Sequence, residues 1–405
     1  MFNKIFQKVI IKSSLFLIWG ICIGSSYAEA QRAIHLNDAV QLAIANHPLA
    51  KNADLRVQNA ESSVNAYPYL KPTEFNFIYG QTHSATYTKS FEISQNLGSP
   101  FTQYQNIKYG KEQVRLAKSD QALSLKQLTS MVKSAYMKWL FDRMVIQQTL
   151  SEAELCGDFE NYFSANLPDS LMLPKASAQS LYADVQRRLY IAEEEFKYST
   201  NQMKQLLCIS EMPVLSDTTM ELYAIAAFRP GKDKFEPWTY IDYYEQKQKL
   251  TDCEVNLERS KLTPEIKGGY FTQQIEQQYG FRGYMIGLNF PVFFNGQSAK
   301  IKEAKINREI AKNELEFQKS NLRSTIENLQ VRLDQDFVSI SYYRENALPE
   351  ADLIINNSLQ RLADKKITYN VHLENITKAF GMKLAYLVEL RNYNETAIEL
   401  EHYLN

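Results

Sequence analysis

Two very long helical patterns constrain this chain more than any other feature of its sequence. They cover residues 101–166 and 298–363. The 405 residues include only 14 Gly and 12 Pro, a composition that favours long uninterrupted elements. A helix of about 65 residues is roughly 100 Å long at 1.5 Å per residue. A rod of that length cannot form a globular core, so we expect it to pack along neighbouring helices.

An apolar stripe supports this packing in the second long pattern. Its positions step by three, four or seven residues and are Ala304, Ala311, Leu315, Leu322, Ile326, Leu329, Leu333, Phe337 and Ile340. The other faces are rich in Lys, Glu and Arg. Taken alone, this stripe is also typical of a plain coiled-coil spacer. Pro349 lies within the pattern and predicts a kink there.

The plan of the chain occurs twice, with an offset of about 196 residues. Each copy reads as an opening helix, two short alternating runs, a long helix, a break and a return helix. The opening helices are predicted at about 36–66 and 238–262, and the return helices at about 171–207 and 367–403. An opening helix plus a return helix matches the long helix in length, so the two would stack end to end beside it. The predicted divisions are a signal peptide (1–30), a first repeat (31–207), an equatorial linker between the repeats (208–235) and a second repeat (236–405).

The alternating runs are predicted strands, at about 74–81, 87–97, 265–275 and 282–293. In the last run, one face carries Tyr284, Ile286, Leu288 and Phe290, and the other carries small or polar residues. The runs are close to the roughly 9–11 residues that a tilted strand needs to cross a bilayer. We therefore expect the apolar face to contact lipid and the other face a wet lumen. One such strand alone would equally fit a half-buried strand of a soluble sheet.

Four strands cannot close a barrel, and an open sheet edge in lipid would leave backbone groups without hydrogen bonds. Several chains must therefore share one barrel. Two chains would supply 8 strands and three would supply 12, and the periodicity leaves both possibilities open.

The N-terminus reads as a signal peptide. Lys4, Lys8 and Lys12 precede a short apolar core at 13–24, and small residues follow at Ala28 and Ala30, where we expect cleavage. Cys22 raises the alternative of a lipid anchor, but Ile21 before it is untypical of a lipoprotein signal. Beyond residue 30 no apolar stretch approaches 18 residues, so no transmembrane helix is predicted.

Several segments resemble the TolC family of outer-membrane efflux proteins. The opening-helix motif of that family falls on Leu36, Ala39, Ala43, Asn46 and Pro48. Residues 347–376 resemble the family's Leu-Pro-x-Ala segment that leads into a hairpin tip, and residues 287–311 resemble its second strand-to-helix passage. Within that passage, residues 293–311 most resemble the outer-membrane subunits of heavy-metal efflux systems, of the CzcC and CusC type.

The resemblance implies a mainly α fold with a β-barrel portion. Three chains would form a 12-stranded barrel in the outer membrane and a 12-helix tunnel through the periplasm. The homotrimer would be a passive channel rather than an enzyme. It would conduct substrate, by this resemblance heavy-metal cations, from a periplasmic adaptor and an inner-membrane pump of the resistance-nodulation-division (RND) class. Drug-efflux and type I secretion ducts share this architecture and remain alternatives.

The resemblance also names candidate sites at the two hairpin tips. Adaptor contacts are expected at the breaks, on Pro168, Asp169, Lys365 and Lys366, where the family often has Gly. The family's two acidic entrance positions fall on Val371 and Glu374, so only Glu374 can supply a carboxylate ring, which would favour cations. Asn370 and His372 lie nearby, and His372 would add pH sensitivity if it faced the lumen. Alternatively, Glu374 is a solvated charge on a helix face.

No sequence motif indicates catalysis or a bound cofactor. The five histidines form no metal-binding pair, and Walker, GxGxxG and GxSxG motifs are absent. Met and Cys residues are scattered, so no soft-metal site is predicted. A net charge of −1 argues against a nucleic-acid partner. A periplasmic adaptor or coiled-coil scaffold would explain the helices but not the strands, and an exported enzyme of α+β fold would need a catalytic group of residues that the sequence lacks.

Overall fold

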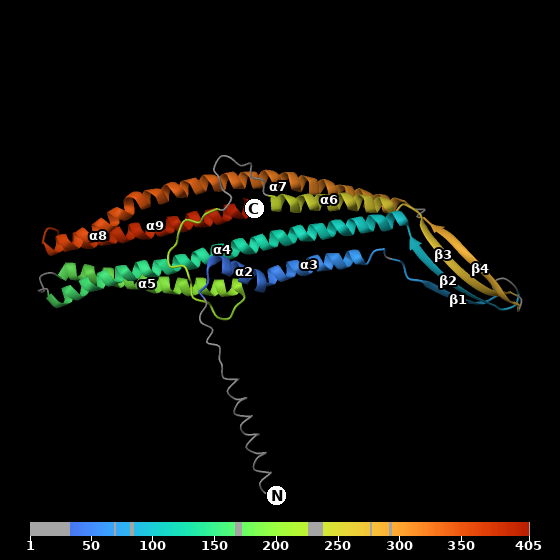
Figure 1. Cartoon of the computed structure of the whole chain (residues 1–405), viewed down its shortest axis with the longest axis horizontal. Coiled ribbons are helices and arrows are strands. Elements are labelled where there is room, and N and C mark those ends of the chain that lie inside the picture. Colours follow the sequence, from blue (N-terminus) through green and yellow to red (C-terminus); the bar gives the residue numbers. More distant parts are fainter. Residues whose placement is uncertain are drawn as a thin grey trace, which may run out of the picture.

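The computed structural model describes residues 33–68, 70–81, 85–166, 172–225, 238–275, 278–290 and 294–404. The molecule is a long rod in which the helices run side by side and a four-stranded sheet extends from one end (Figure 1). Two helical-hairpin tips lie at the opposite end of the rod, one formed by α4 and α5 and the other by α8 and α9. No helix in the described ranges is both long and apolar enough to cross a membrane.

The first repeat begins with two helices rather than the single helix predicted over about 36–66. They are α2 (Leu36–Asn46) and α3 (Pro48–Asn65). The prediction of one continuous helix is wrong at His47, because Pro48 disfavours helical geometry in the residue before it. His47 is extended, with φ −68° and ψ 133°, and its side chain accepts a hydrogen bond from the Leu49 N–H. The chain continues through β1 (Glu74–Gly80), β2 (Thr88–Gly98), α4 (Pro100–Asn166) and α5 (Met172–Leu207).

The second repeat has the same order of elements. It consists of α6 (Trp238–Ser260), β3 (Glu265–Ile275), β4 (Gln278–Asn289), α7 (Asn295–Tyr342), α8 (Leu348–Ala363) and α9 (Tyr369–Leu404). A five-residue π-helical segment, Tyr343–Ala347, separates α7 from α8 just before Pro349. Pro349 has no backbone N–H, so it cannot donate the α-helical hydrogen bond to the carbonyl four residues earlier. A short π-helical segment before the proline accommodates this missing bond. The helix path turns at this point (Figure 1), as the sequence predicts.

The short helices stack along the long ones. α2, α3 and α5 pack against α4, whose 67 residues span about 100 Å at 1.5 Å per residue. In the second repeat, α6 and α9 pack against α7 in the same way, and α4 also contacts α6 and α9. The predicted end-to-end stacking is thus confirmed, and α4 joins the two repeats.

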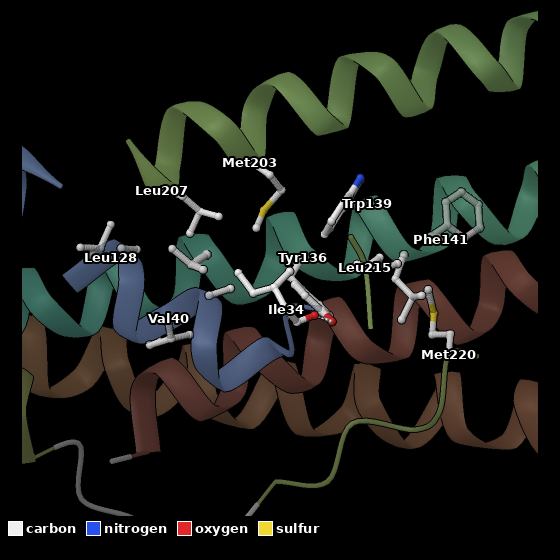
Figure 2. Close-up of a cluster of buried hydrophobic side chains, with 14 of the residues drawn as sticks. Ile34, Val40, Leu128, Tyr136, Trp139, Phe141, Met203, Leu207, Leu215 and Met220 are labelled. Carbon is white, nitrogen blue, oxygen red and sulfur yellow. Dashed lines mark hydrogen bonds between the residues drawn. The ribbon is translucent and has the colours of Figure 1, made fainter. Parts of the chain in front are cut away.

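A large buried cluster forms around α2, which lies near the middle of the rod (Figure 1), and Figure 2 shows it in close-up. It gathers side chains from α2, α3, α4, α5, α7, α9 and the segments before α2 and after α5. Figure 2 labels Ile34, Val40, Leu128, Tyr136, Trp139, Phe141, Met203, Leu207, Leu215 and Met220. Burying a large apolar side chain stabilises the fold by about 1.5–3 kcal/mol. Backbone bonds attach the start of the chain to this region, because Ile34 N–H donates to Val214 O at 2.9 Å and Ser216 N–H donates to Ile34 O at 3.2 Å.

The sheet is antiparallel throughout, in the order β1-β2-β3-β4. β2, β3 and β4 have 11, 11 and 12 residues, and β1 has 7. β4 starts at Gln278, four residues before the predicted start, and its last residue is Asn289 rather than 293. In a single chain β1 and β4 are edge strands, so both carry backbone groups that no described strand pairs with.

Candidate functional site

The register of the sheet separates two chemically different faces. Phe75, Ile93, Tyr270 and Tyr284 are cross-strand partners in one row, and directly paired residues lie on the same face. The face that contains this row, here called the apolar face, also carries Phe77, Tyr79, Phe91, Ile286 and Leu288. Most of these side chains are exposed in the single chain, so the apolar face is uncovered.

Three of the four residues predicted to face lipid lie on this face within β4, and the fourth, Phe290, follows the strand. Tyr284 and Ile286 are 87% and 85% exposed, and Leu288 and Phe290 are each 62% exposed. Phe290 lies one residue past the end of β4. Exposed apolar side chains of this size are costly in water, which is why this surface needs an apolar environment.

The opposite face, here called the polar face, carries charged and hydroxyl groups joined by hydrogen bonds. Lys267 Nζ lies 2.7 Å from Glu74 Oε2, and Ser94 Oγ donates to the same carboxylate at 3.3 Å. Asn96 Nδ2 donates to Glu265 Oε2 at 2.9 Å. A sheet with one apolar and one polar face can separate lipid from water.

At the other end of the rod, the candidate entrance residues divide between two sides of α9. Asn370 and Glu374 are exposed and lie four residues apart, on one side of the helix. His372, about 200° around the helix from Asn370, is fully buried between α8 and α9. The condition for pH sensitivity at the lumen, a His372 side chain that faces it, is therefore not met in the single chain. Asn370 and Glu374 are exposed there, and their place at the entrance stays a prediction.

The side chain of His372 is completely buried. Its Nδ1 lies 2.7 Å from Ser358 Oγ of α8, and the Tyr369 ring lies 6.5 Å from the imidazole, centroid to centroid. Burial lowers the pKa of His372 below its ordinary value, and the hydrogen bond with Ser358 opposes part of that shift. The imidazole therefore favours its neutral form inside the hairpin.

Lys365 and Lys366 form the exposed turn between α8 and α9, where adaptor contacts were predicted. Lys365 has φ +59°, a left-handed conformation that glycine adopts most readily. Lys366 N–H donates to Arg361 O at 2.8 Å and Lys365 N–H donates to Leu362 O at 3.0 Å, which closes the end of α8. The turn thus contains a left-handed residue of the kind that glycine adopts most readily, and its role in adaptor contacts stays a prediction. The other predicted contacts, Pro168 and Asp169, lie outside the described residues, as does the predicted signal peptide (1–30).

Sequence reasoning missed a polar network near the middle of the rod. Asp217 accepts a hydrogen bond from Tyr136 Oη at 2.6 Å and lies 3.1 Å from His35 Nδ1. Nearby, Lys133 Nζ pairs with Glu401, and both side chains are largely buried. Because these partners are far apart in the sequence, no local pattern indicates them. A local pattern does indicate one neighbour of Glu374. Lys378 is exposed and lies four residues further along α9, so the sequence alone places it on the same side of the helix.

No group of three or more His, Cys, Asp or Glu side chains suited to a metal occurs in the described parts of the chain. The free cysteines Cys156 and Cys253 are buried, and burial raises the pKa of each thiol. Raised pKa values leave these thiols protonated and unreactive.

Comparison with known proteins finds the likeness in structure rather than in sequence. No family model and no curated protein matches the sequence. The structure is similar to that of CusC, which forms a transmembrane channel, at 13% identity and a TM-score of 0.78, covering 91% of this chain and 92% of CusC. It is similar to the outer-membrane channel OprN at 14% identity and 0.74, covering 91% and 90% of the two chains. It is also similar to the outer-membrane protein VceC of Vibrio cholerae, at 13% identity and a TM-score of 0.70, covering 91% of this chain and 94% of VceC. The chain therefore has the fold of the TolC-family outer-membrane channels.

Proposed function

We propose that this chain is the outer-membrane channel subunit of a tripartite efflux system. Three copies would form a 12-stranded barrel in the outer membrane and a helical tunnel through the periplasm. The channel would be passive, with no catalytic step, and would accept substrate from a periplasmic adaptor and an RND pump. The similar solved structures include outer-membrane channels such as OprN and MtrE of Neisseria gonorrhoeae, which supports this role.

One observation carries the proposal. An open four-stranded sheet, apolar on one face and polar on the other, extends from a rod of helices about 100 Å long. A lone sheet cannot sit in lipid with open edges, so β1 of one copy must pair with β4 of the next. A scaffold or adaptor made of helices alone would have no use for such a sheet.

The assembly is tested by cross-linking the protein in mild detergent and by comparing heated with unheated samples on a gel. We expect a three-chain species that migrates differently before heating. A stable monomer in membranes would refute the shared barrel, and a dimer would favour an eight-stranded one.

For the cargo, we propose heavy-metal cations. The support is the sequence resemblance of residues 293–311 to metal-efflux subunits and the exposed Glu374 near the hairpin tip. Deleting the gene should sensitise cells to heavy-metal ions more than to dyes and detergents. The opposite pattern would favour the drug-efflux alternative, and loss of a secreted protein would favour type I secretion.

A further inference from the structure

The charges of the sheet are divided between its two faces. Three strand carboxylates, Glu74, Glu92 and Glu265, lie on the polar face. The apolar face carries no carboxylate in the described strands, but it carries two exposed cations, Lys89 and Arg282. No salt bridge to either cation is found among the described residues. A largely apolar surface thus bears two positive charges that form no ion pair with a described residue.

Both cations lie toward the end of the sheet that carries the two hairpin turns. Lys89 pairs with Tyr79, one position from the β1–β2 turn. Arg282 pairs with Thr272, which also pairs with Phe91. Because Phe91 is two residues after Lys89 on β2, the row of Arg282 lies about 7 Å further from the hairpin turns than the row of Lys89 does. From Arg282 to Leu288 the apolar face continues for about 20 Å along β4, and the exposed Phe290 follows just past the strand. This length covers more than half of the apolar band of a tilted transmembrane strand.

A pair of stacked tyrosines lies beside the outer cation, Lys89. Tyr79 and Tyr87 stack with ring centroids 5.4 Å apart, and Lys89 Nζ lies 6.0 Å from the Tyr79 ring. Tyrosine rings of this kind sit at the boundary between hydrocarbon and headgroups, because each has an apolar body and a polar end. The row of Lys89 therefore fits the headgroup level of a membrane, where a positive charge costs little.

We propose that Lys89 and Arg282 bind the phosphorylated headgroup of a lipid in the leaflet around the turn end of the sheet. This rests on the proposed function, since it requires the apolar face to lie in lipid. Arginine and lysine are the side chains that bind phosphate best, and arginine does so with two parallel N–H donors. In a 12-stranded barrel, the two cations would recur on every second strand and form a belt of six positive charges around the channel.

The test is native mass spectrometry of the detergent-solubilised mature protein, titrated with diphosphoryl lipid A and with monophosphoryl lipid A. We expect tighter binding of the diphosphoryl form. Lys89→Gln and Arg282→Gln should each weaken its binding about fivefold, and the double variant about 25-fold. Lys89→Arg and Arg282→Lys should retain most of the binding. Lys302→Gln, which removes an exposed charge on α7 outside the sheet, should bind like the wild type.

Two results would overturn the inference. One is a double variant that binds diphosphoryl lipid A as tightly as the wild type does. The other is displacement of the lipid by millimolar inorganic phosphate, which would indicate a site for free anions. Every variant must first run as the heat-modifiable trimer. If the wild type itself gives no trimer, the proposed function fails, and this outcome differs from a trimer that shows no phosphate preference.

Discussion

Because His372 is buried, we predict that the α8–α9 hairpin tip becomes less stable in mild acid. Its pKa is lowered in the folded state by burial, so the unfolded chain, with an ordinary pKa of about 6.5, takes up a proton first. Above that pH both states are neutral and the histidine has no effect on stability. As pH falls below about 6.5, the unfolded or opened tip gains a proton that the packed tip resists, and stability declines. At pH 5 the loss reaches about 2 kcal/mol if the packed histidine stays neutral.

Hydrogen exchange measures this effect locally, because opening of the tip exposes the amides of α8 and α9 to solvent. The wild type and His372→Gln are compared at pH 7.5 and pH 5, with each pair at the same pH so that intrinsic exchange rates cancel. We expect the wild-type tip to lose protection relative to the variant as the pH falls, by about 30-fold at most. His402→Gln is the matched control, because burial also lowers the pKa of His402 but this residue lies near the other end of α9. Equal acid sensitivity in wild type and His372→Gln would refute the reasoning.

Three further predictions concern the tip and the sheet. Glu374→Gln should weaken cation selectivity in single-channel recordings, whereas Lys378→Gln, one turn away, should strengthen it; unchanged selectivity in both would remove Glu374 from the entrance. Lys365→Gly should stabilise the α8–α9 turn by about 1 kcal/mol, because it relieves the left-handed backbone at φ +59°, and thermal unfolding or tip-specific hydrogen exchange measures this. Gly283→Ala should reduce the yield of heat-modifiable trimer, because a Cβ there would meet the Phe271 ring at 2.4 Å; a normal yield would show that the ring moves aside freely.

The elements of this fold were predictable because their periodicities are long and regular. The apolar stripe of α7 is buried at Leu315, Leu322 and Leu329 as the helical period requires, whereas Phe337, predicted to share it, is 50% exposed in the single chain. The period of two in β4 placed Tyr284, Ile286 and Leu288 on one face before any register was known. The error at His47 was avoidable, since Pro48 is visible in the sequence and restricts the residue before it.

The candidate entrance was less predictable, because a helix pattern does not tell which neighbour covers which face. Asn370, His372 and Glu374 are close in sequence, but the contact of α9 with α8 decides that His372 is inside. The pairing of Lys133 with Glu401 joins residues 268 positions apart, and nothing local in the sequence indicates it. The two cations of the apolar face were visible in the alternation of their strands, but the absence of carboxylates beside them required the register.

The two unpaired strand edges have a genetic consequence. If β4 of one copy must pair with β1 of the next, no subunit can complete its own wall, and one defective edge leaves a gap in the whole ring. A cell that produces normal and edge-defective subunits in equal amounts would assemble only about one in eight rings from normal subunits alone, if mixing is random. Defects in the edge strands should therefore be dominant over the normal gene, whereas a deletion of the gene should be recessive.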